Sequence, residues 1–245
     1  HTGSLVGADD VFDSALRRAG AVRAMTIEQL FSAAHVLSSG YRVKGNRLAL
    51  VTNAGGPGVL AADRAADLDL ELPAPGEATM AHLDEKLPGF WSRGNPVDIL
   101  GDAPPERYRE AVGTLLSDRG YDGVLAMLTP QAMTRPTEAA DALVEAASHS
   151  KKPLLGCWMG EEEVRAGRER LSQHGVPNFQ TPETAVEAFG YLASYYRNQQ
   201  MLMQVPSPLL DQSESDPEGA RLIIESALDE GRHGLTSMEA KAVLT

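Results

Sequence analysis

Between residues 47 and 198 the apolar residues of this chain follow two alternating patterns. Short continuous apolar runs, typical of strands covered on both faces, alternate with longer segments in which apolar residues recur every three or four positions. The runs predict strands at 48–52, 68–72, 123–128, 153–158 and near 177–179. The periodic segments predict helices at 58–66, 76–86, 104–116, 135–148, 161–174 and 181–198. This alternation predicts an α/β domain with a buried parallel sheet.

Five such strands favour a flavodoxin-like, doubly wound parallel sheet with flanking helices over residues 45–198. Outside it the pattern is helical only, with helices expected at 9–19, 26–37, 217–230 and 236–244 and linkers at 40–45 and 206–218. Thr26 is the expected N-cap of the second helix. Two helices without a sheet predict that residues 1–40 are the C-terminal tail of a preceding α/β domain.

The stretch LALVTNAGGPGVLAADRAA, from residue 48 to residue 66, combines a buried strand, a glycine-rich break and a helix. Gly55, Gly56 and Gly58 let the backbone turn sharply and approach a ligand, and the following helix start carries about half a positive charge. This pattern predicts a phosphate or carboxylate site; a tight turn without a ligand is the alternative. No Lys-Ser/Thr pair follows the glycines, which excludes a Walker loop, and the dinucleotide fingerprint is poor.

Ligands of doubly wound sheets bind beyond the carboxyl ends of the strands. Three loops are expected to meet there, at 53–58, 129–134 and 159–163, joined by residues 94–102. Asn53, Thr129 and Gln131 supply polar groups for an anion, whereas Asp98 and Asp102 make no strong case for acid–base chemistry. At the next strand end, Trp158 and Met159 fit either an acyl pocket or the core, and Glu161, Glu162 and Glu163 fit a helix first turn.

Composition narrows the function. A net charge of −12 over 245 residues argues against nucleic acid as a partner, and no apolar run is long enough to cross a membrane. The single cysteine, Cys157, excludes an internal disulfide framework and is expected to pack in a strand, which fits a cytoplasmic protein. The histidines at positions 35, 82, 149, 174 and 233 show no metal-ligand spacing, so no metal site is expected. The chain begins at His1 rather than Met, so we expect a piece of a longer protein.

Ordered blocks along the chain resemble the NDP-forming (ADP-forming) acyl-CoA synthetases, a superfamily that includes succinyl-CoA synthetase. They read HTGSLVGADDVFDSALRRAGAVRA, RLALVTNAGGPGVLAADRA, GNPVDILGDAPPERYREA, TPQA, GCWMGEEEVRAG and GVPNFQTPETAVEAF. The resemblance implies the end of a first ligase domain, a complete succinyl-CoA ligase-like domain, and over 199–245 a linker and the start of an ATP-grasp domain. It implies acyl-CoA, phosphate and nucleotide as substrates, CoA, ATP/ADP and Mg²⁺ as cofactors of the whole protein, and a homo-oligomer.

The resemblance also assigns residue roles. It places the phosphate-carrying catalytic histidine at His1, with Asn53, Gly55, Gly56, Gly58, Thr129 and Gln131 binding phosphate or carboxylate. Pro130 departs from the glycine-rich turn of succinyl-CoA synthetases, which weakens the transfer of their substrate contacts. The segment YYRNQQMLMQVPSP and its continuation also resemble the synthetase-like half of GNAT-fused protein lysine acetyltransferases. The alternative function is therefore a ligand-sensing and oligomerising module, with protein substrates handled by a GNAT domain.

Overall fold

The computed structural model describes residues 8–204 and 216–244. The chain divides into two compact units, His1–Met203 and Gln204–Thr245, and each is described by itself. Within the described part, no helix combines the length and the apolar character needed to cross a membrane.

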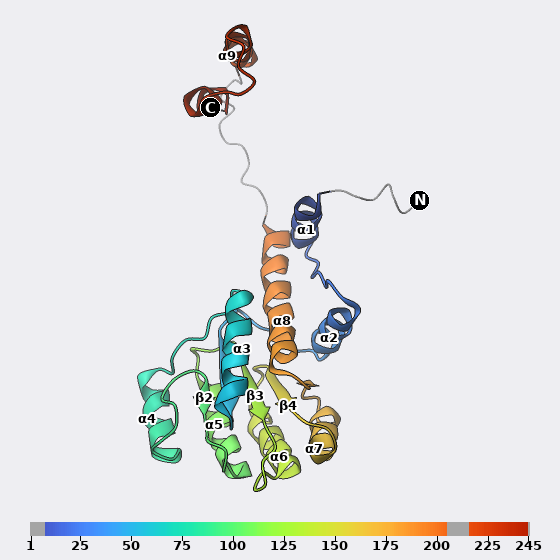
Figure 1. Cartoon of the computed structure of the whole chain (residues 1–245), viewed down its shortest axis with the longest axis vertical. Helices are drawn as coiled ribbons and strands as arrows, with labels where there is room; N and C mark the ends of the chain where they lie inside the picture. The colour runs from blue at the N-terminus through green and yellow to red at the C-terminus, as the bar shows by residue number, and fades with distance from the viewer. Residues whose placement is uncertain (1–7, 205–215, 245) are drawn as a thin grey trace. The chain divides into compact units, whose positions relative to one another are not determined.

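The first unit contains a five-stranded, fully parallel sheet in the order β2-β1-β3-β4-β5 (Figure 1). Its strands are β1 (Leu48–Thr52), β2 (Val97–Asp98), β3 (Gly123–Leu128), β4 (Leu154–Trp158) and β5 (Asn178–Phe179). All residues of β1, β3 and β4 are buried, which explains why these strands are continuous apolar runs in the sequence. The predicted flavodoxin-like order is confirmed.

Helices cover both faces of this sheet. The helices of the first unit are α1 (Asp9–Arg18), α2 (Ile27–Ser38), α3 (Gly55–Asp67), α4 (Glu77–Lys86), α5 (Pro105–Ser117), α6 (Pro136–Ala147), α7 (Glu162–Gln173) and α8 (Pro182–Met203). Successive residues of β1 alternate between faces: Leu48 and Leu50 pack with α3 and α8, while Ala49 and Val51 pack with α5 and α6. Figure 1 shows α3 and α8 side by side on their face.

One predicted strand is wrong. Residues 68–72 contribute only a single-residue parallel bridge, Arg47 with Glu71, and the sheet's second strand lies instead at Val97–Asp98. Between the bridge and β2, the side chain of Asn95 takes the place of a neighbouring strand. Its Oδ1 accepts from Leu50 N at 2.9 Å and its Nδ2 donates to Leu48 O at 2.8 Å. The edge of β1 is thus completed by a bridge, a side-chain amide and a two-residue strand.

Most helix boundaries agree with the pattern, with two informative differences. Thr26 caps α2 as expected, accepting from Gln29 N at 3.1 Å. However, α3 begins at Gly55 rather than Gly58, because Gly55, Gly56 and Pro57 form its first turn, where backbone N–H groups need no helical partner. The other difference is at α8, which runs five residues beyond the predicted end and reaches Met203.

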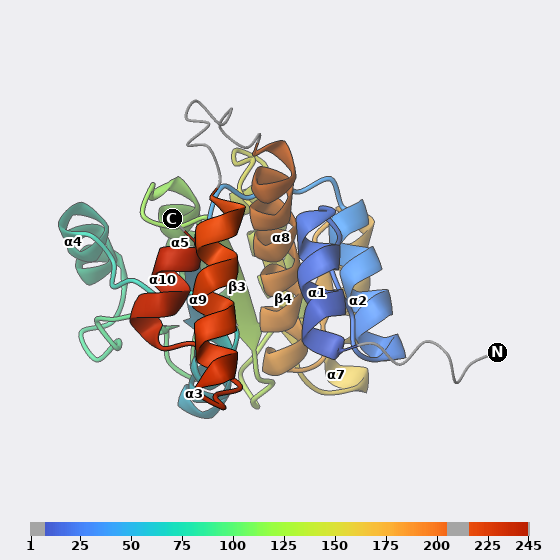
Figure 2. The same ribbon diagram turned by 90° about the horizontal axis from the view of Figure 1, so that it is seen from above.

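The N-terminal helices α1 and α2 lie beside α8 (Figure 2). Asn198, which is buried, donates to Ala21 O, and Gln199 donates to Gly20 O, so two side-chain amides fix the turn that follows α1. Gly20 has a φ of 78° there, a left-handed conformation that favours glycine.

In the described part of the second unit there are two helices, α9 (Pro217–Asp229) and α10 (Ser237–Leu244). Arg232 joins them through a bidentate pair with Glu239 at 2.8–2.9 Å. Only Ala227 of α9 is buried, while Leu222, Leu228 and Met238 are exposed. A helix pair of this size buries too little apolar surface for an independent core.

Candidate functional site

The loops that follow β1 and β3 are tied together at the carboxyl end of the sheet. Asn53, directly after β1, is buried and donates from Nδ2 to Thr129 O at 2.9 Å, while its Oδ1 accepts from Thr129 N at 2.8 Å. A two-way amide contact of this kind fixes the position of both loops. Asn53 therefore holds the turn after β3 in place, and its predicted role as an anion ligand stays a prediction.

Two glycines bring the remaining loops into the same cluster. A Cβ on Gly101, after β2, would lie 2.6 Å from the side-chain amide of Gln131, so Gln131 lies directly over Gly101. A Cβ on Gly160, after β4, would lie 3.3 Å from Pro130, and Gly160 has a φ of 109° that excludes most side chains. The expectation that the loops after β1, β2, β3 and β4 meet at one edge is confirmed.

The N-terminus of α3 is an electropositive feature of this cluster. The N–H groups of Gly55 and Gly56 have no acceptor among the described residues, and both glycines are exposed. Gly58 anchors the turn beneath them, since a Cβ there would lie 3.2 Å from Thr52 Cγ2. Two free donors at the positive end of a helix form a backbone nest of the kind that accepts anions, which is the arrangement predicted from the glycine-rich break. That this nest binds a phosphate or carboxylate stays a prediction.

The turn after β3 contributes a further polar group. Thr129 Oγ1 is buried and has no hydrogen-bond partner in the part of the chain that the structure describes. A buried hydroxyl without a partner costs about 1–3 kcal/mol. Gln131 is exposed, and its N–H is already bound to Thr134 Oγ1 at 2.9 Å.

Sequence reasoning undervalued Asp98. This residue ends β2, and its Oδ1 accepts from Leu100 N at 2.9 Å, which fixes the carboxylate. A Cβ on Gly55 would lie 3.7 Å from Asp98 Oδ2, so the carboxylate lies beside the first turn of α3. The pairing of Val51 with Val97 in the sheet places it there, and nothing in the local sequence does. Any anion bound at the nest therefore has a negatively charged neighbour.

Several candidates have structural roles. Trp158 is fully buried and donates from Nε1 to Pro136 O at 3.0 Å, so it belongs to the core rather than to an acyl pocket. Cys157 is fully buried in β4 as expected, and burial raises the pKa of its thiol to about 12. Asp102 pairs with Arg107 at 2.7 Å; the hydrogen bond from Arg107 lowers the pKa of the carboxyl.

His1 lies outside the described residues, so the structure says nothing of its surroundings. Among the described residues, no group of three or more His, Cys, Asp or Glu side chains is placed to hold a metal ion.

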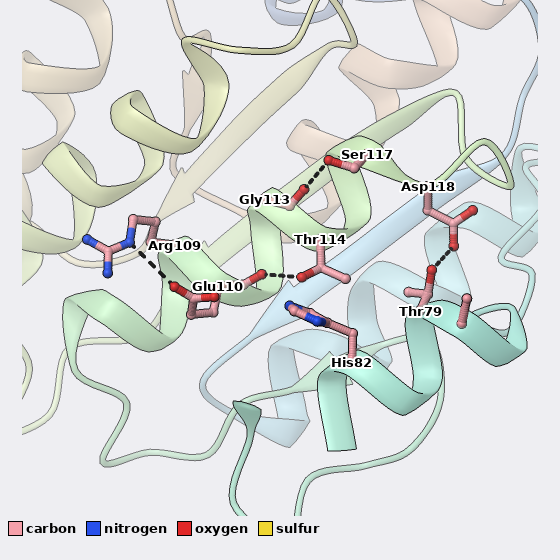
Figure 3. A pocket seen from close by; sticks show the side chains of 9 residues that line it. Thr79, His82, Arg109, Glu110, Gly113, Thr114, Ser117 and Asp118 are labelled. Atoms are coloured by element: carbon pink, nitrogen blue, oxygen red, sulfur yellow. Dashed lines mark hydrogen bonds and ion pairs between the residues drawn. The ribbon is translucent and has the colours of Figure 1, made fainter. Parts of the chain in front are cut away.

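A separate groove of about 450 Å³ lies between α4 and α5, away from the carboxyl-end loops (Figure 3). Its hydroxyl groups are satisfied by its own walls: Thr79 donates to Asp118 Oδ2, Thr114 to Glu110 O and Ser117 to Gly113 O. Since these hydroxyls have partners already, the groove offers a ligand less than the nest does.

The fold and the site define a flavodoxin-like α/β domain with a nest of free backbone N–H groups at the carboxyl end of its first strand. Two family models match the sequence: the "Ligase-CoA domain" over residues 48–205 and the "Succinyl-CoA ligase like flavodoxin domain" over residues 1–37. The chain belongs to the Ligase-CoA domain family.

Two relatives of the chain are ADP-forming ligases. Acetate–CoA ligase (ADP-forming) I of Archaeoglobus fulgidus is 40% identical over 195 residues, which cover 80% of this chain and 27% of that protein. 4-Hydroxybutyrate–CoA ligase (ADP-forming) of Nitrosopumilus maritimus is 30% identical over 244 residues, covering all of this chain and 34% of the relative. This chain thus spans about a third or less of the length of these two relatives.

A solved structure supports the fold. The dinucleotide-forming acetyl-coenzyme A synthetase 1 of Ca. Korarchaeum cryptofilum, in complex with phosphate and ADP, matches with a TM-score of 0.77 and 30% identity. The match covers 84% of this chain and 46% of that one. These relatives are ligases and carry no information on a GNAT domain, so the resemblance to GNAT-fused acetyltransferases stays a prediction.

Proposed function

We propose that this chain is a segment of an ADP-forming acyl-CoA synthetase in which the nest at α3 binds the phosphoryl group during its transfer. The observation that carries the proposal is the pair of unpartnered N–H groups of Gly55 and Gly56 at the N-terminus of α3. The buried, unpartnered hydroxyl of Thr129 supports it, because it offers a further hydrogen bond in the same loop cluster. The domain supplies electrostatic stabilisation rather than a nucleophile.

In this proposal the phosphoryl carrier is His1. A neutral imidazole nitrogen attacks an acyl phosphate, forming an N–P bond and releasing the carboxylate, and the phosphohistidine then passes its phosphoryl group to ADP. Residues 1–40 are the tail of the ligase domain that carries this histidine, and residues 199–245 lead into an ATP-grasp domain that binds the nucleotide and Mg²⁺.

Exposed apolar side chains on the N-terminal helices support this division into domains. Val11, Phe12, Ile27, Leu30 and Phe31 each expose more than half of their surface. An apolar face of this size on α1 and α2 is expected where the remainder of a domain packs.

The nest is tested by removing one donor without disturbing the helix. Gly55 is the first residue of α3, where proline is favoured, and Ala54 before it is already extended, as a residue before proline requires. Gly55→Pro therefore deletes the N–H and keeps the helix, while Gly55→Ala keeps both. We expect Gly55→Pro to weaken binding of inorganic phosphate about tenfold or more by calorimetry, and Gly55→Ala to leave it unchanged. Equal affinities in the two variants would contradict the nest.

The carrier is tested in the full-length protein. Incubation with radiolabelled ATP and Mg²⁺ should give an acid-labile protein label that is lost in His1→Ala and retained in His35→Ala, whose histidine lies in α2. A full-length protein that acquires no label would refute the phosphohistidine route. The isolated chain is expected to synthesise no acyl-CoA, because in the proposal it lacks complete CoA-binding and ATP-grasp domains.

A further inference from the structure

A second cavity in the first unit lies between the N-terminal helices and the ligase domain. It has a volume of about 260 Å³ and is bounded by α1, α2 and the turn between them on one side and by α3 and α8 on the other. This volume equals that of about nine water molecules in the liquid, so it fits a small organic ligand rather than a cofactor.

Arginine dominates the lining of this cavity. Four arginines but only two acids line it, although the chain as a whole has 22 basic and 34 acidic residues. The two lining acids are each committed to an arginine: Glu187 accepts from Arg64 at 2.6 Å and Asp13 from Arg17 at 2.6 Å. The other oxygen of Asp13 lies 3.8 Å from Arg23, so among the lining arginines only Arg197 has no acid of the lining beside it.

Arg23 has a second acidic partner at the rim, where it donates to Asp9 at 3.0 Å. The side chain of Asp9 is 72% exposed, so water screens this pair strongly. Arg197 has no acid within ion-pair distance among the described residues, and its guanidinium contacts only Ser194 Oγ at 3.4 Å. Arg197 is exposed, and its guanidinium lines the cavity beside the Ser194 hydroxyl with no acidic partner among the described residues.

Tyr191 provides a further donor. Its hydroxyl has no hydrogen-bond partner in the described part of the chain, and burial, reinforced by Glu187, raises its pKa to about 12. The hydroxyl thus stays protonated at neutral pH and available to donate. Val22, Met25 and Leu68 add apolar surface to the same lining.

We propose that this cavity binds a small monoanionic or dianionic organic ligand, with its phosphate or carboxylate on Arg197, Ser194 and Tyr191 and its apolar part against Val22 and Leu68. The bound ligand connects the N-terminal segment, residues 1–37, to α8, and so strengthens the attachment of that segment to the ligase domain. Arginine suits this role because its planar fork matches carboxylate and phosphate oxygens.

Phenyl phosphate is a suitable probe, since it joins one dianion to one apolar ring and has about as many non-hydrogen atoms as the cavity has room for waters. Phenol and inorganic phosphate, each lacking one half, serve as control ligands. We expect phenyl phosphate to bind at least tenfold more tightly than phenol by calorimetry and to slow hydrogen exchange of the amides in residues 20–29.

Variants separate this site from the nest. Arg197→Gln should weaken binding about tenfold or more, and Ser194→Leu, which fills the cavity, should abolish it. Arg165→Gln is the matched control, because Arg165 is an exposed arginine of α7 that pairs with Glu162. Both Arg165→Gln and Gly55→Pro should leave the affinity unchanged. No binding of phenyl phosphate at millimolar concentration, or equal affinities in the Arg197→Gln and Arg165→Gln proteins, would overturn the proposal.

Discussion

Replacing Asn95 by alanine should destabilise the first unit strongly, because its side-chain amide completes the edge of β1. The amide makes three hydrogen bonds: Oδ1 with Leu50 N at 2.9 Å, and Nδ2 with Leu48 O at 2.8 Å and with Pro73 O at 3.1 Å. Leu48 and Leu50 are fully buried, so water cannot easily replace the amide. Each buried group left without a partner costs about 1–3 kcal/mol, so losing the partners of Leu50 N–H and Leu48 C=O should lower the free energy of unfolding by about 3 kcal/mol.

The assay is urea unfolding followed by far-UV circular dichroism and by the fluorescence of the buried Trp91 and Trp158. A loss of about 3 kcal/mol is a large fraction of the roughly 5–15 kcal/mol that stabilises a typical domain. Asn46→Ala is the matched control, because Asn46 donates a single side-chain bond, to Asp69 O at 2.8 Å. It should cost about 0.5–1.5 kcal/mol.

A second substitution tests the same reasoning through charge. In Asn95→Asp the carboxylate can still accept from Leu50 N. Its other oxygen, however, faces the carbonyl oxygens of Leu48 and Pro73, to which Nδ2 donates in the unsubstituted protein. This repulsion raises the pKa of the carboxyl in the folded state, so the variant should regain stability as pH falls and the carboxyl is protonated. Equal losses for Asn95→Ala and Asn46→Ala, or an Asn95→Asp penalty that does not shrink at low pH, would refute the account of the sheet edge.

Three further predictions concern single side chains. Asp98→Asn removes the carboxylate beside the nest and should raise the affinity for inorganic phosphate about threefold or more, and this increase should shrink with added salt. Asp102→Asn is the control. If calorimetry shows no gain in affinity for Asp98→Asn, the carboxylate does not repel the bound phosphate. Burial alone would raise the pKa of Asp122, but hydrogen bonds from the side chain and backbone of Arg47 outweigh burial and lower the pKa. The stability that these hydrogen bonds add is therefore present above the pKa of the unfolded state, near 4, and is lost as pH falls below that value. The destabilisation by Asp122→Asn in urea should therefore be larger at pH 7 than at pH 3. Cys157 should react with a thiol reagent only in urea, since burial holds its pKa at about 12; rapid labelling of the folded protein would show that β4 opens.

The pattern of apolar residues predicted the sheet well wherever a strand is buried on both faces, as β1 and β3 are. The pattern failed at the edge of the sheet, where the side chain of Asn95 makes the hydrogen bonds to Leu48 and Leu50 that a neighbouring strand would make. Periodicity describes neighbouring residues, whereas this contact spans 45 positions and depends on a side chain imitating a peptide group.

The same limit applies to the candidate site. The glycine-rich break predicted free N–H groups at a helix start, because that property is local to residues 55–58. The contact of Asn53 with Thr129 and the approach of Asp98 to Gly55 arise from strand order and register. Sequence reasoning therefore identified the donors of the nest and could not identify what surrounds them.

The length of α8 has a mechanical consequence. Its 22 residues span about 33 Å, whereas a five-residue strand such as β4 spans about 17 Å, so nearly half of the helix projects beyond the sheet. A tilt of about 10° at the sheet would move the far end by roughly 3 Å over that overhang. Asn198 and Gln199 attach the turn after α1 to this projecting part, so such a tilt would move α1 together with the end of α8.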